Sequence, residues 1–332
     1  MADVAQAAGV SVASVSRVIN HLPHVTPEIH ERVGAAMAEL GYVANPTARA
    51  LAGGRTQVIG LLTQEVQNPF SYAVISGVDE AVSGLGYDFL LCTTHARREK
   101  EAEYVARLSG GMVDGLLIIL PRGLPDYVGE LRAASFPFVL IDYDADAPGC
   151  SVVNATNRQG ARAAIRHLLD LGHRRIGFIT GRPNVGATTE RLAGYRDALA
   201  ESGIRFDAGM VEVGGYTAEG GERAMRDVLR RVTPPPTAVF AATMMSAAGA
   251  MKAMRATGLV VPKDISIVAI HDGILAEMLE PPLTTVRLPT QEMGYEAARG
   301  LVDLIEGRVA RVVRVLSPRE LAVRSSTAPP RN

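Results

Sequence analysis

The chain has 332 residues, which is long enough for more than one domain, since single domains ordinarily hold about 100–200 residues. Hydrophobic residues make up 47% and charged residues 21%, so large packed cores are expected and a disordered chain is excluded. The formal net charge of −1 excludes a protein that binds polyanions through bulk charge, and any DNA contact must come from a local arrangement.

The cysteine content and the apolar runs indicate the compartment. The two cysteines, Cys92 and Cys150, are too few for a disulfide framework and fit a reducing environment. The first residues contain no charged segment followed by an apolar stretch, so no secretion signal is expected. No apolar run reaches the roughly 20 residues that a membrane span needs. We therefore expect a cytoplasmic protein without membrane contact.

Two short helices are predicted at the N-terminus. The first has an apolar stripe at helical spacing and ends at Gly9, a residue that readily adopts positive φ. Ser11 is a good N-cap for the second helix, which runs from Val12 to about Asn20. Its apolar side chains face the first helix and small polar or basic ones point away. This pattern is typical of a helix-turn-helix.

A third helix and a short fourth one follow. Thr26 caps the third helix, Pro27 stands at its first position and Gly41 ends it, with an apolar stripe formed by Val33, Met37 and Leu40. The segment Asn45–Ala52 is capped by Asn45 and precedes two glycines. Such a short helix is unstable alone in water, so it would form only against a partner.

These motifs resemble a known family. Val-Ala-x-x-Ala-Gly-Val-Ser-x-x-x-Val-Ser-Arg-Val-Ile-Asn, followed by Leu-Gly-Tyr-x-x-Asn-Pro-x-Ala-Arg-x-Leu, is similar to the headpiece and hinge of the LacI/GalR repressors. The resemblance implies that Val12, Ala13 and Arg17 read base edges in the major groove and that Leu51 wedges into the minor groove. The remaining implied DNA-binding residues, several of which contact phosphates, are Ser11, Ser14, Ser16, Asn20, Asn45 and Ala48.

The charge of this segment departs from what a DNA-binding surface favours. Over residues 1–55 the basic side chains are Arg17, Arg32, Arg49 and Arg55, and the acidic ones are Asp3, Glu28, Glu31 and Glu39. Four minus four leaves no net charge, so electrostatic attraction to phosphates should be weak unless His21, His24 and His30 contribute.

After Thr56, short apolar runs alternate with helical patterns. Buried strands are predicted at 58–62, 89–92, 115–119, 138–141, 175–180, 238–241 and 265–270. Amphipathic helices are predicted at 73–85, 99–108, 160–171, 189–201, 221–231 and 246–256. This alternation indicates parallel sheets with right-handed crossovers, which bind ligands beyond the carboxyl ends of their strands.

The large segment also resembles the LacI/GalR family, whose core is similar to type I periplasmic sugar-binding proteins. The landmarks are Asn68-Pro69-Phe70, Val113-Asp114-Gly115, Leu171 to Ile176, Glu190-Arg191-x-x-Gly194-Tyr195 and Pro282 to Val286. The fold class is thus expected to be α/β, with a three-helix headpiece and a two-lobe core.

We divide the chain into a headpiece (1–44), a hinge and linker (45–56), a core (57–324) and a disordered tail (325–332). Within the core, lobe one covers about 57–157 and 288–316, and lobe two covers 158–287 and 317–324.

The resemblance places a small-molecule effector between the lobes, at Gln64, Phe70, Asp142, Arg191, Thr243 and His271. A guanidinium and a carboxylate could bind hydroxyls there, while Phe70 stacks on an apolar ring face. Each of three residues also has a structural alternative. Phe70 could belong to the core, Asp142 could cap the loop after its strand, and His271 could be purely structural.

Two positions depart from the family pattern. The chain has Thr243-Met244 where relatives usually have Asn-Asp, and His271-Asp272 where they usually have Asp-Asp. The carboxylate replaced by His271 commonly binds sugar hydroxyls in the family. An imidazole offers only one bond where the carboxylate offers two acceptors. The effector is therefore expected to be a sugar or a related compound that is more acidic or less hydroxylated.

Enzyme motifs are absent from the sequence. The loop Gly181 to Thr188 resembles a phosphate loop, but Ala187 stands where the lysine is needed, so it is interpreted as a strand-to-helix turn facing the cleft. Neither His-Glu-x-x-His nor Gly-x-Ser-x-Gly occurs, and no cysteine pair has metal-ligand spacing. We expect no catalysis, no cofactor and no metal.

The sequence predicts a transcriptional repressor that binds a pseudo-palindromic double-stranded operator as a homodimer. A metabolite in the cleft would change operator affinity allosterically, and family members include both induced and co-repressed proteins. The tail has no heptads, which favours a dimer over a tetramer. Two alternatives stay open: a solute-binding transport component without DNA binding, and an enzyme regulated through an attached DNA-reading domain.

Overall fold

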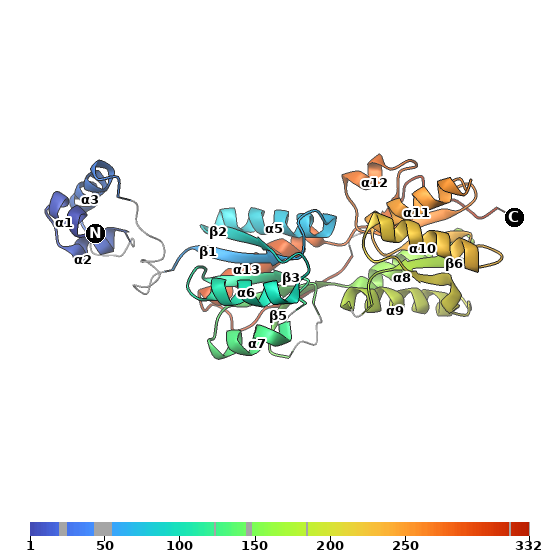
Figure 1. Ribbon diagram of the computed structural model, residues 1–332, viewed down its shortest axis with the longest axis horizontal. Coiled ribbons are helices and arrows are strands. Elements are labelled where there is room, and N and C mark those ends of the chain that lie inside the picture. The colour runs from blue at the N-terminus through green and yellow to red at the C-terminus, as the bar shows by residue number, and fades with distance from the viewer. Residues whose placement is uncertain are drawn as a thin grey trace.

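A computed structural model describes residues 1–19, 25–42, 55–122, 124–143, 148–183, 185–318 and 320–331. These residues form a small N-terminal group of helices and two larger lobes, each built on its own six-stranded sheet (Figure 1). The expected fold class, a helical headpiece with a two-lobe core of parallel sheets, is confirmed. Within the described residues, no helix is long and apolar enough to cross a bilayer.

The headpiece contains α1 (Ala2–Ala8), α2 (Val12–Ile19) and α3 (Pro27–Glu39). The predicted caps are present: the backbone N–H of Ser14 donates to Ser11 Oγ at 3.1 Å, and that of Ile29 donates to Thr26 Oγ1 at 3.4 Å. Gly9 follows α1 with a φ of 61°, as expected. The prediction for Leu40 is wrong. Its side chain is 48% exposed because Leu40 lies beyond the last turn of α3, and Ala36 fills the core in its place.

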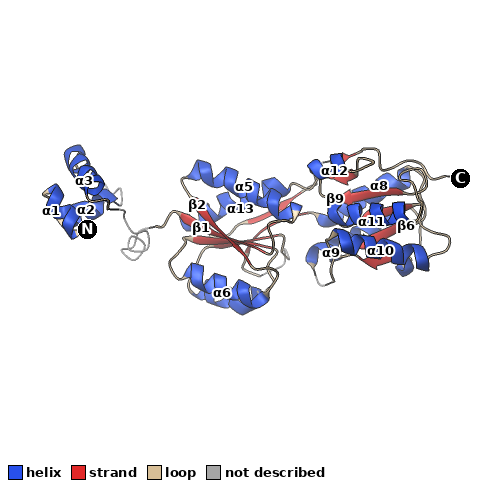
Figure 2. Cartoon of the chain, turned by 45° about the horizontal axis from the view of Figure 1, so that its top comes forward, coloured by secondary structure: helices blue, strands red, loops and turns tan. Residues whose placement is uncertain are grey.

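The first lobe is a parallel sheet in the order β11-β5-β4-β3-β1-β2. Helices α5 and α13 cover one face, and α6 and α7 cover the other (Figure 2). The strands are β1 (Val58–Thr63), β2 (Asp88–Thr93), β3 (Gly115–Ile119), β4 (Phe138–Ile141), β5 (Ser151–Ala155) and β11 (Val313–Leu316). The helices are α5 (Pro69–Leu85), α6 (Arg98–Ser109), α7 (Leu124–Ala133) and α13 (Thr290–Ile305).

The second lobe repeats this architecture with the order β12-β10-β9-β8-β6-β7, in which only β12 is antiparallel to its neighbour. Helices α8 and α9 cover one face, and α10 and α11 cover the other. The strands are β6 (Ile176–Thr180), β7 (Val211–Val213), β8 (Ala238–Ala241), β9 (Ser266–Ile270), β10 (Thr284–Val286) and β12 (Leu321–Ala322). The helices are α8 (Asn157–Asp170), α9 (Gly186–Glu201), α10 (Ala218–Arg231), α11 (Met244–Ala256) and α12 (Ile274–Met278), with a 3₁₀ turn at Ala208–Met210.

Glycines allow the helices on each face to approach closely. A Cβ on Gly77 of α5 would lie 1.8 Å from the Gln291 carbonyl oxygen of α13, and one on Gly294 of α13 would lie 2.0 Å from the Val74 carbonyl oxygen. The two glycines therefore form a reciprocal contact between backbones. Gly221 and Gly249 make the same kind of contact between α10 and α11.

The predicted strands and helices of the core all occur, with ends shifted by a few residues. The pattern missed β5, β7, β10, β11 and β12, as well as α7, α12 and α13. Edge strand β7 has three residues, and β11 is largely exposed, so neither has the apolar run of a buried strand. Pairing with a neighbour holds each strand in place: β7 pairs with β6, and β11 pairs with β5.

The C-terminal segment differs from its prediction as a disordered tail. Ser326 is fully buried, and its hydroxyl accepts from the Thr284 N–H at 2.8 Å and donates to the Ile267 carbonyl at 2.6 Å. The backbone N–H of Ala328 donates to Ser266 Oγ, and its carbonyl lies 2.8 Å from His173 Nε2. Residues 325–331 are thus part of the second lobe, held by partners that are distant in sequence.

Candidate functional site

The exposed face of α2 is the candidate DNA-binding surface. Val15 and Val18 of α2 are buried against the headpiece core, whereas Val12 is 48% exposed and Ala13 and Arg17 are also exposed. The helical period alone produces this division. Ser14 and Ser16 lie along the same helix, and Ser11 caps it. The predicted DNA contacts Asn20, Asn45, Ala48 and Leu51 fall outside the described residues.

Arg32 is used inside the headpiece. Its Nη2 donates to the carbonyl oxygens of Ala8 at 2.6 Å and of Gly9 at 3.0 Å, at the C-terminal end of α1. The guanidinium thus satisfies carbonyls that the end of a helix leaves without intrahelical partners, at the negative end of its dipole. The charge count over residues 1–55 includes Arg32 as a basic group available to phosphates, but in the structure its guanidinium binds these carbonyls.

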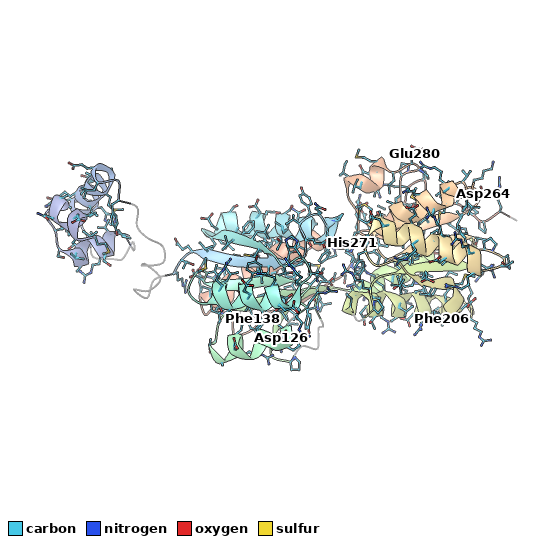
Figure 3. All side chains as sticks on the ribbon, viewed as in Figure 1. Asp126, Phe138, Phe206, Asp264, His271 and Glu280 are labelled. Carbon is cyan, nitrogen blue, oxygen red and sulfur yellow. The ribbon has the colours of Figure 1, made fainter. Side chains whose placement is uncertain are left out.

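A cavity of about 540 Å³ lies between the two lobes, where His271 is found (Figure 3). All six predicted effector-binding residues line it: Gln64, Phe70, Asp142, Arg191, Thr243 and His271. Five of them follow a strand or begin the next helix, and Arg191 lies on the second turn of α9, so the six residues gather near the carboxyl ends of parallel strands, as the rule for open α/β sheets predicts. The volume is within the range of small-molecule sites.

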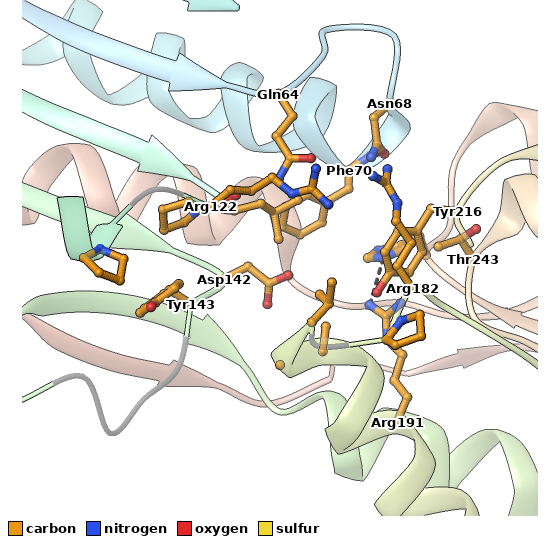
Figure 4. A pocket seen from close by; sticks show the side chains of 18 residues that line it. Gln64, Asn68, Phe70, Arg122, Asp142, Tyr143, Arg182, Arg191, Tyr216 and Thr243 are labelled. Carbon is orange, nitrogen blue, oxygen red and sulfur yellow. Dashed lines mark hydrogen bonds between the residues drawn. The ribbon is translucent and has the colours of Figure 1, made fainter. Parts of the chain in front are cut away.

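Figure 4 shows how the labelled side chains divide between the two walls of the cavity. Gln64, Arg122, Asp142 and Tyr143 come from the first lobe, and Arg182, Arg191, Tyr216 and Thr243 come from the second. The order of the strands in the chain explains this division, because each residue either follows a strand of its own lobe or lies on the helix after that strand.

Arg191 is the most buried charged group of the cavity, with only 2% of its surface exposed. It extends from α9 and donates from Nε to Asn157 Oδ1 at 2.9 Å, from Nη1 to the Ala242 carbonyl at 2.7 Å and from Nη2 to His271 Nε2 at 3.1 Å. Burial lowers the pKa of Arg191, while Tyr216 and Asp142 oppose that shift. The guanidinium has five N–H groups, so it retains donors for a ligand.

Asp142 follows β4 with a left-handed backbone, at a φ of 56°. Burial raises the pKa of its carboxyl group, and the Arg191 charge and a hydrogen bond from Asn157 Nδ2 at 3.3 Å oppose the shift. Leu120 and His271, which also line the cavity, have φ values of 52° and 71°. Non-glycine residues in this region are uncommon and gather at ligand sites.

The other predicted residues have structural partners as well as a place at the cavity. Gln64 Nε2 donates to the Leu120 carbonyl at 2.7 Å, and Thr243 caps α11 through the Ser246 N–H. Phe70 is buried in the main core and contacts the His271 ring edge-on, with centroids 5.4 Å apart. For Phe70 the core and cavity interpretations therefore both hold.

Several cavity residues were not predicted. Arg122 and Tyr143 follow β3 and β4, so the strand-end rule could have found them. Arg182 belongs to the loop between β6 and α9, whose turn assignment was correct but whose side chain was not considered. Tyr216 follows β7, a strand too short for the pattern to reveal, so no sequence signal marked it. No cluster that could hold a metal ion occurs in the part of the chain that the structure describes.

Comparisons with known proteins agree with this architecture. Residues 1–45 match the family described as bacterial regulatory proteins, lacI family, and residues 165–327 match a periplasmic binding protein-like domain. The HTH-type transcriptional regulator CelR of Thermobifida fusca is 39% identical, over 97% of this chain and 96% of the relative. DegA of Bacillus subtilis, another HTH-type transcriptional regulator, is 34% identical over 98% and 97%.

Two solved structures cover the chain at similar extent. The lac repressor dimer bound to operator and the anti-inducer ONPF has a TM-score of 0.86 at 29% identity, covering 98% of both chains. The complex of CelR with cellobiose has a TM-score of 0.74 at 38% identity, also covering 98% of both chains. The headpiece, the two lobes and these full-length relatives lead to one conclusion: the chain belongs to the LacI family of DNA-binding transcriptional regulators.

Proposed function

We propose that the protein is a repressor whose affinity for a pseudo-palindromic operator is controlled by a small metabolite, a sugar or a sugar-like compound, in the cavity between the lobes. Residues 1–44 would read the operator, 45–56 would form the hinge, and 57–324 would bind the effector. The observation that carries the proposal is a cavity between two lobes, lined by charged and apolar side chains, on a chain that also has a helix-turn-helix headpiece.

The mechanism follows from the positions of the polar groups. The two walls of the cavity come from different lobes, so a ligand that bonds to Asp142 and Arg191 together favours a closed arrangement. Closure would change the separation of the hinges in a homodimer and thereby the fit of two recognition helices to successive major grooves. A coupling free energy of about 1–3 kcal/mol is sufficient for a useful switch. The lac repressor dimer on its operator and the cellobiose complex of CelR support this combination.

The first test is selection of bound sequences from a random duplex pool by the full-length protein. Recovery of a pseudo-palindrome with half-sites about one helical turn apart is expected. Recovery of no sequence would instead support the alternative of a solute-binding transport component, which no observation on this chain favours. Since LacI-family relatives are transcriptional regulators, we also propose binding without catalysis, in the cytoplasm where the operator lies.

The second test measures operator binding of two variants with and without a ligand found by screening. Arg191→Ala should lose the ligand response and keep operator binding, and Leu51→Ala should weaken operator binding and keep ligand binding. The matched control is Arg230→Ala, at an exposed arginine of α10 that does not line the cavity. A ligand response retained in Arg191→Ala would contradict the assignment of the cavity as the effector site.

A further inference from the structure

The cavity between the lobes has an excess of positive charge. Among its described lining residues, three arginines (Arg122, Arg182 and Arg191) face one carboxylate, Asp142. His271 adds no charge, because the adjacent Arg191 and its own burial lower its pKa well below 6.5. Arg122 is exposed to solvent, so the charge that a neutral ligand would leave uncompensated in the enclosed part of the site is that of Arg182 and Arg191, where charge–charge interactions are stronger than in water.

Two of these arginines form no ion pair with a carboxylate among the described residues, although the charge of Asp142 acts on Arg191 through space. Arg191 is 2% exposed, and its three hydrogen-bond partners are an amide oxygen, a backbone carbonyl and an imidazole nitrogen. Arg182 lies over the Tyr216 ring, 6.0 Å from its centroid, and has no carboxylate within 4.0 Å among the described residues. Buried charges are ordinarily paired, so a buried Arg191 and a half-buried Arg182 on the second-lobe wall of the cavity favour an anion there.

The protonation of His271 gives an independent indication. The Arg191 guanidinium can only donate, so His271 Nε2 must accept and the ring proton must lie on Nδ1. Nδ1 is buried, the residue is 8% exposed, and no described group accepts from this nitrogen. An unpaired buried donor is unfavourable. Because Nδ1 has almost no exposed surface, a ligand oxygen can accept from it only after neighbouring atoms shift, and that bond would then pair the donor.

His271 changes the hydrogen-bonding role of its position from an acceptor to a donor. The resemblance to the LacI/GalR pattern leads us to expect a carboxylate at this position, which would accept from the hydroxyls of a neutral sugar. His271 instead offers a donor, and its Nε2 lies 3.1 Å from Arg191 Nη2. A ligand group that only donates would meet no acceptor among Arg182, Arg191 and His271, whereas a carboxylate or phosphate would accept from all of them.

We infer that the ligand carries an anionic oxygen group, bound by Arg182, Arg191 and His271, and hydroxyls that donate to Asp142 on the opposite wall. The inference rests on the proposed function, because it concerns the same cavity. Phe70 and Tyr216 supply the apolar surface against which a sugar ring packs. The ligand class is therefore a hydroxylated acid: a sugar acid, whose anion is a carboxylate, or a sugar phosphate.

The test compares ligands that share a ring and differ in charge. Full-length protein is titrated calorimetrically with D-glucuronate, D-galacturonate and D-glucose 6-phosphate, and with D-glucose, D-galactose and cellobiose as neutral probes. At least one anionic probe should bind about 10- to 100-fold more tightly than its neutral counterpart, and the preference should decline with added salt. Preference for the uronates over the phosphate identifies a carboxylate as the anion, and the reverse identifies a phosphate.

Two variants assign the preference to the named residues. Arg182→Gln removes one charge, and His271→Asp restores an acceptor in a residue that tolerates positive φ. Both should reduce affinity for the anionic probe about 10-fold or more, and His271→Asp should narrow or reverse its margin over the neutral sugar. Arg230→Gln is the matched control, since it removes the same charge from an exposed position outside the cavity and should change neither affinity.

The outcomes separate this inference from the proposed function. If a neutral probe binds as well as every anionic one, or if no anion binds in a way that depends on Arg182 and His271, the inference is wrong. A neutral sugar that changed operator binding through the cavity would then leave the proposed function intact. If an anionic probe binds through these residues but never changes operator binding, the inference holds and the proposed function is wrong.

Discussion

At the scale of single residues, His271 illustrates how burial fixes a protonation state. Its ring is enclosed by Phe70 and Arg191, and desolvation followed by the Arg191 charge lowers its pKa well below 6.5. Burial also lowers the pKa values of His167 and His173 in the second lobe, although an acidic neighbour of His167 and a backbone bond to His173 oppose the shift. In the native protein, burial therefore disfavours the protonated form of all three rings.

These histidines predict that stability decreases under mildly acidic conditions. In the unfolded chain each imidazole is protonated as the pH falls below about 6.5, whereas the native rings resist protonation. The unfolded state then binds more protons, so the free energy of unfolding should fall between about pH 7 and pH 5, by up to about 1.4 kcal/mol per pH unit for each histidine. Urea unfolding at several pH values measures this slope.

His271→Asn serves as the comparison, because asparagine tolerates the positive φ and can still accept from Arg191. Its pH dependence should be shallower than that of the unsubstituted protein by the contribution of one histidine. Equal slopes for the two proteins would show that His271 is protonated in the native state.

At the scale of elements, the end of α1 depends on a residue of α3. Arg32 donates to the carbonyls of Ala8 and Gly9, two acceptors that would otherwise lack a protein partner. Arg32→Ala should destabilise the headpiece by about 1–3 kcal/mol, because the partly buried Ala8 carbonyl and the exposed Gly9 carbonyl lose a charged donor. Hydrogen exchange of the α1 amides in the full-length protein should become faster by a corresponding factor.

Arg17→Ala is the matched control for this prediction. Arg17 is exposed on α2, so its removal should leave hydrogen exchange in α1 unchanged and reduce operator affinity by about 1–3 kcal/mol. If Arg32→Ala left exchange unchanged, Arg32 would not stabilise the end of α1.

The contact between α5 and α13 leads to a second prediction for elements. A Cβ at position 294 would lie 2.0 Å from the Val74 carbonyl oxygen, and neither backbone can move without separating the two helices from the first sheet. Gly294→Ala should therefore lower the free energy of unfolding by about 1–3 kcal/mol or more. The midpoint of urea unfolding gives the change.

Gly129 of α7 provides the opposite case. Nothing lies within 4 Å of a Cβ built there, so Gly129→Ala should stabilise the protein by up to about 1 kcal/mol through better helix propensity. Equal effects of the two substitutions would mean that the close approach of α5 and α13 does not limit side-chain size.

At the scale of the whole molecule, residues 55–57, where the chain enters the first lobe, are held by several hydrogen bonds. The Asp114 carboxylate accepts from the Thr56 N–H and hydroxyl and from the Gln57 N–H, each at 2.8 Å. Arg55 Nη2 donates to the carbonyl of Ile305, the last residue of α13, at 3.0 Å. These bonds fix residues 55–57 to the first lobe.

Under the proposed function, Asp114→Ala should weaken the coupling between ligand binding and operator binding. The carboxylate lies outside the cavity, so calorimetric ligand affinity should stay unchanged, while the ligand-induced change in operator affinity should shrink. Asp227→Ala on α10, another acidic residue outside the cavity, should preserve both. An unchanged ligand effect in Asp114→Ala would show that coupling does not pass through these bonds.

Part of this architecture could be predicted from local patterns. The strands around Leu117, Leu140 and Phe240 are short apolar runs, and their positions were correct because each run is buried on both faces of a parallel sheet. The six cavity residues could be named through resemblance to the family and the strand-end rule. Strand β11 could not be predicted, because its residues are largely exposed and only pairing with β5 makes it a strand.

The sequence by itself determined the helix-turn-helix, the α/β class and the residues at the strand ends, because helix and strand periods and caps are properties of neighbouring residues. The tertiary structure alone decided that Arg122 and Arg182 meet across one cavity, that Arg32 serves α1, that Ser326 is buried and that His271 is neutral. Each of these depends on groups far apart in the chain, whose proximity follows from how the strands cross between lobes and not from any local pattern.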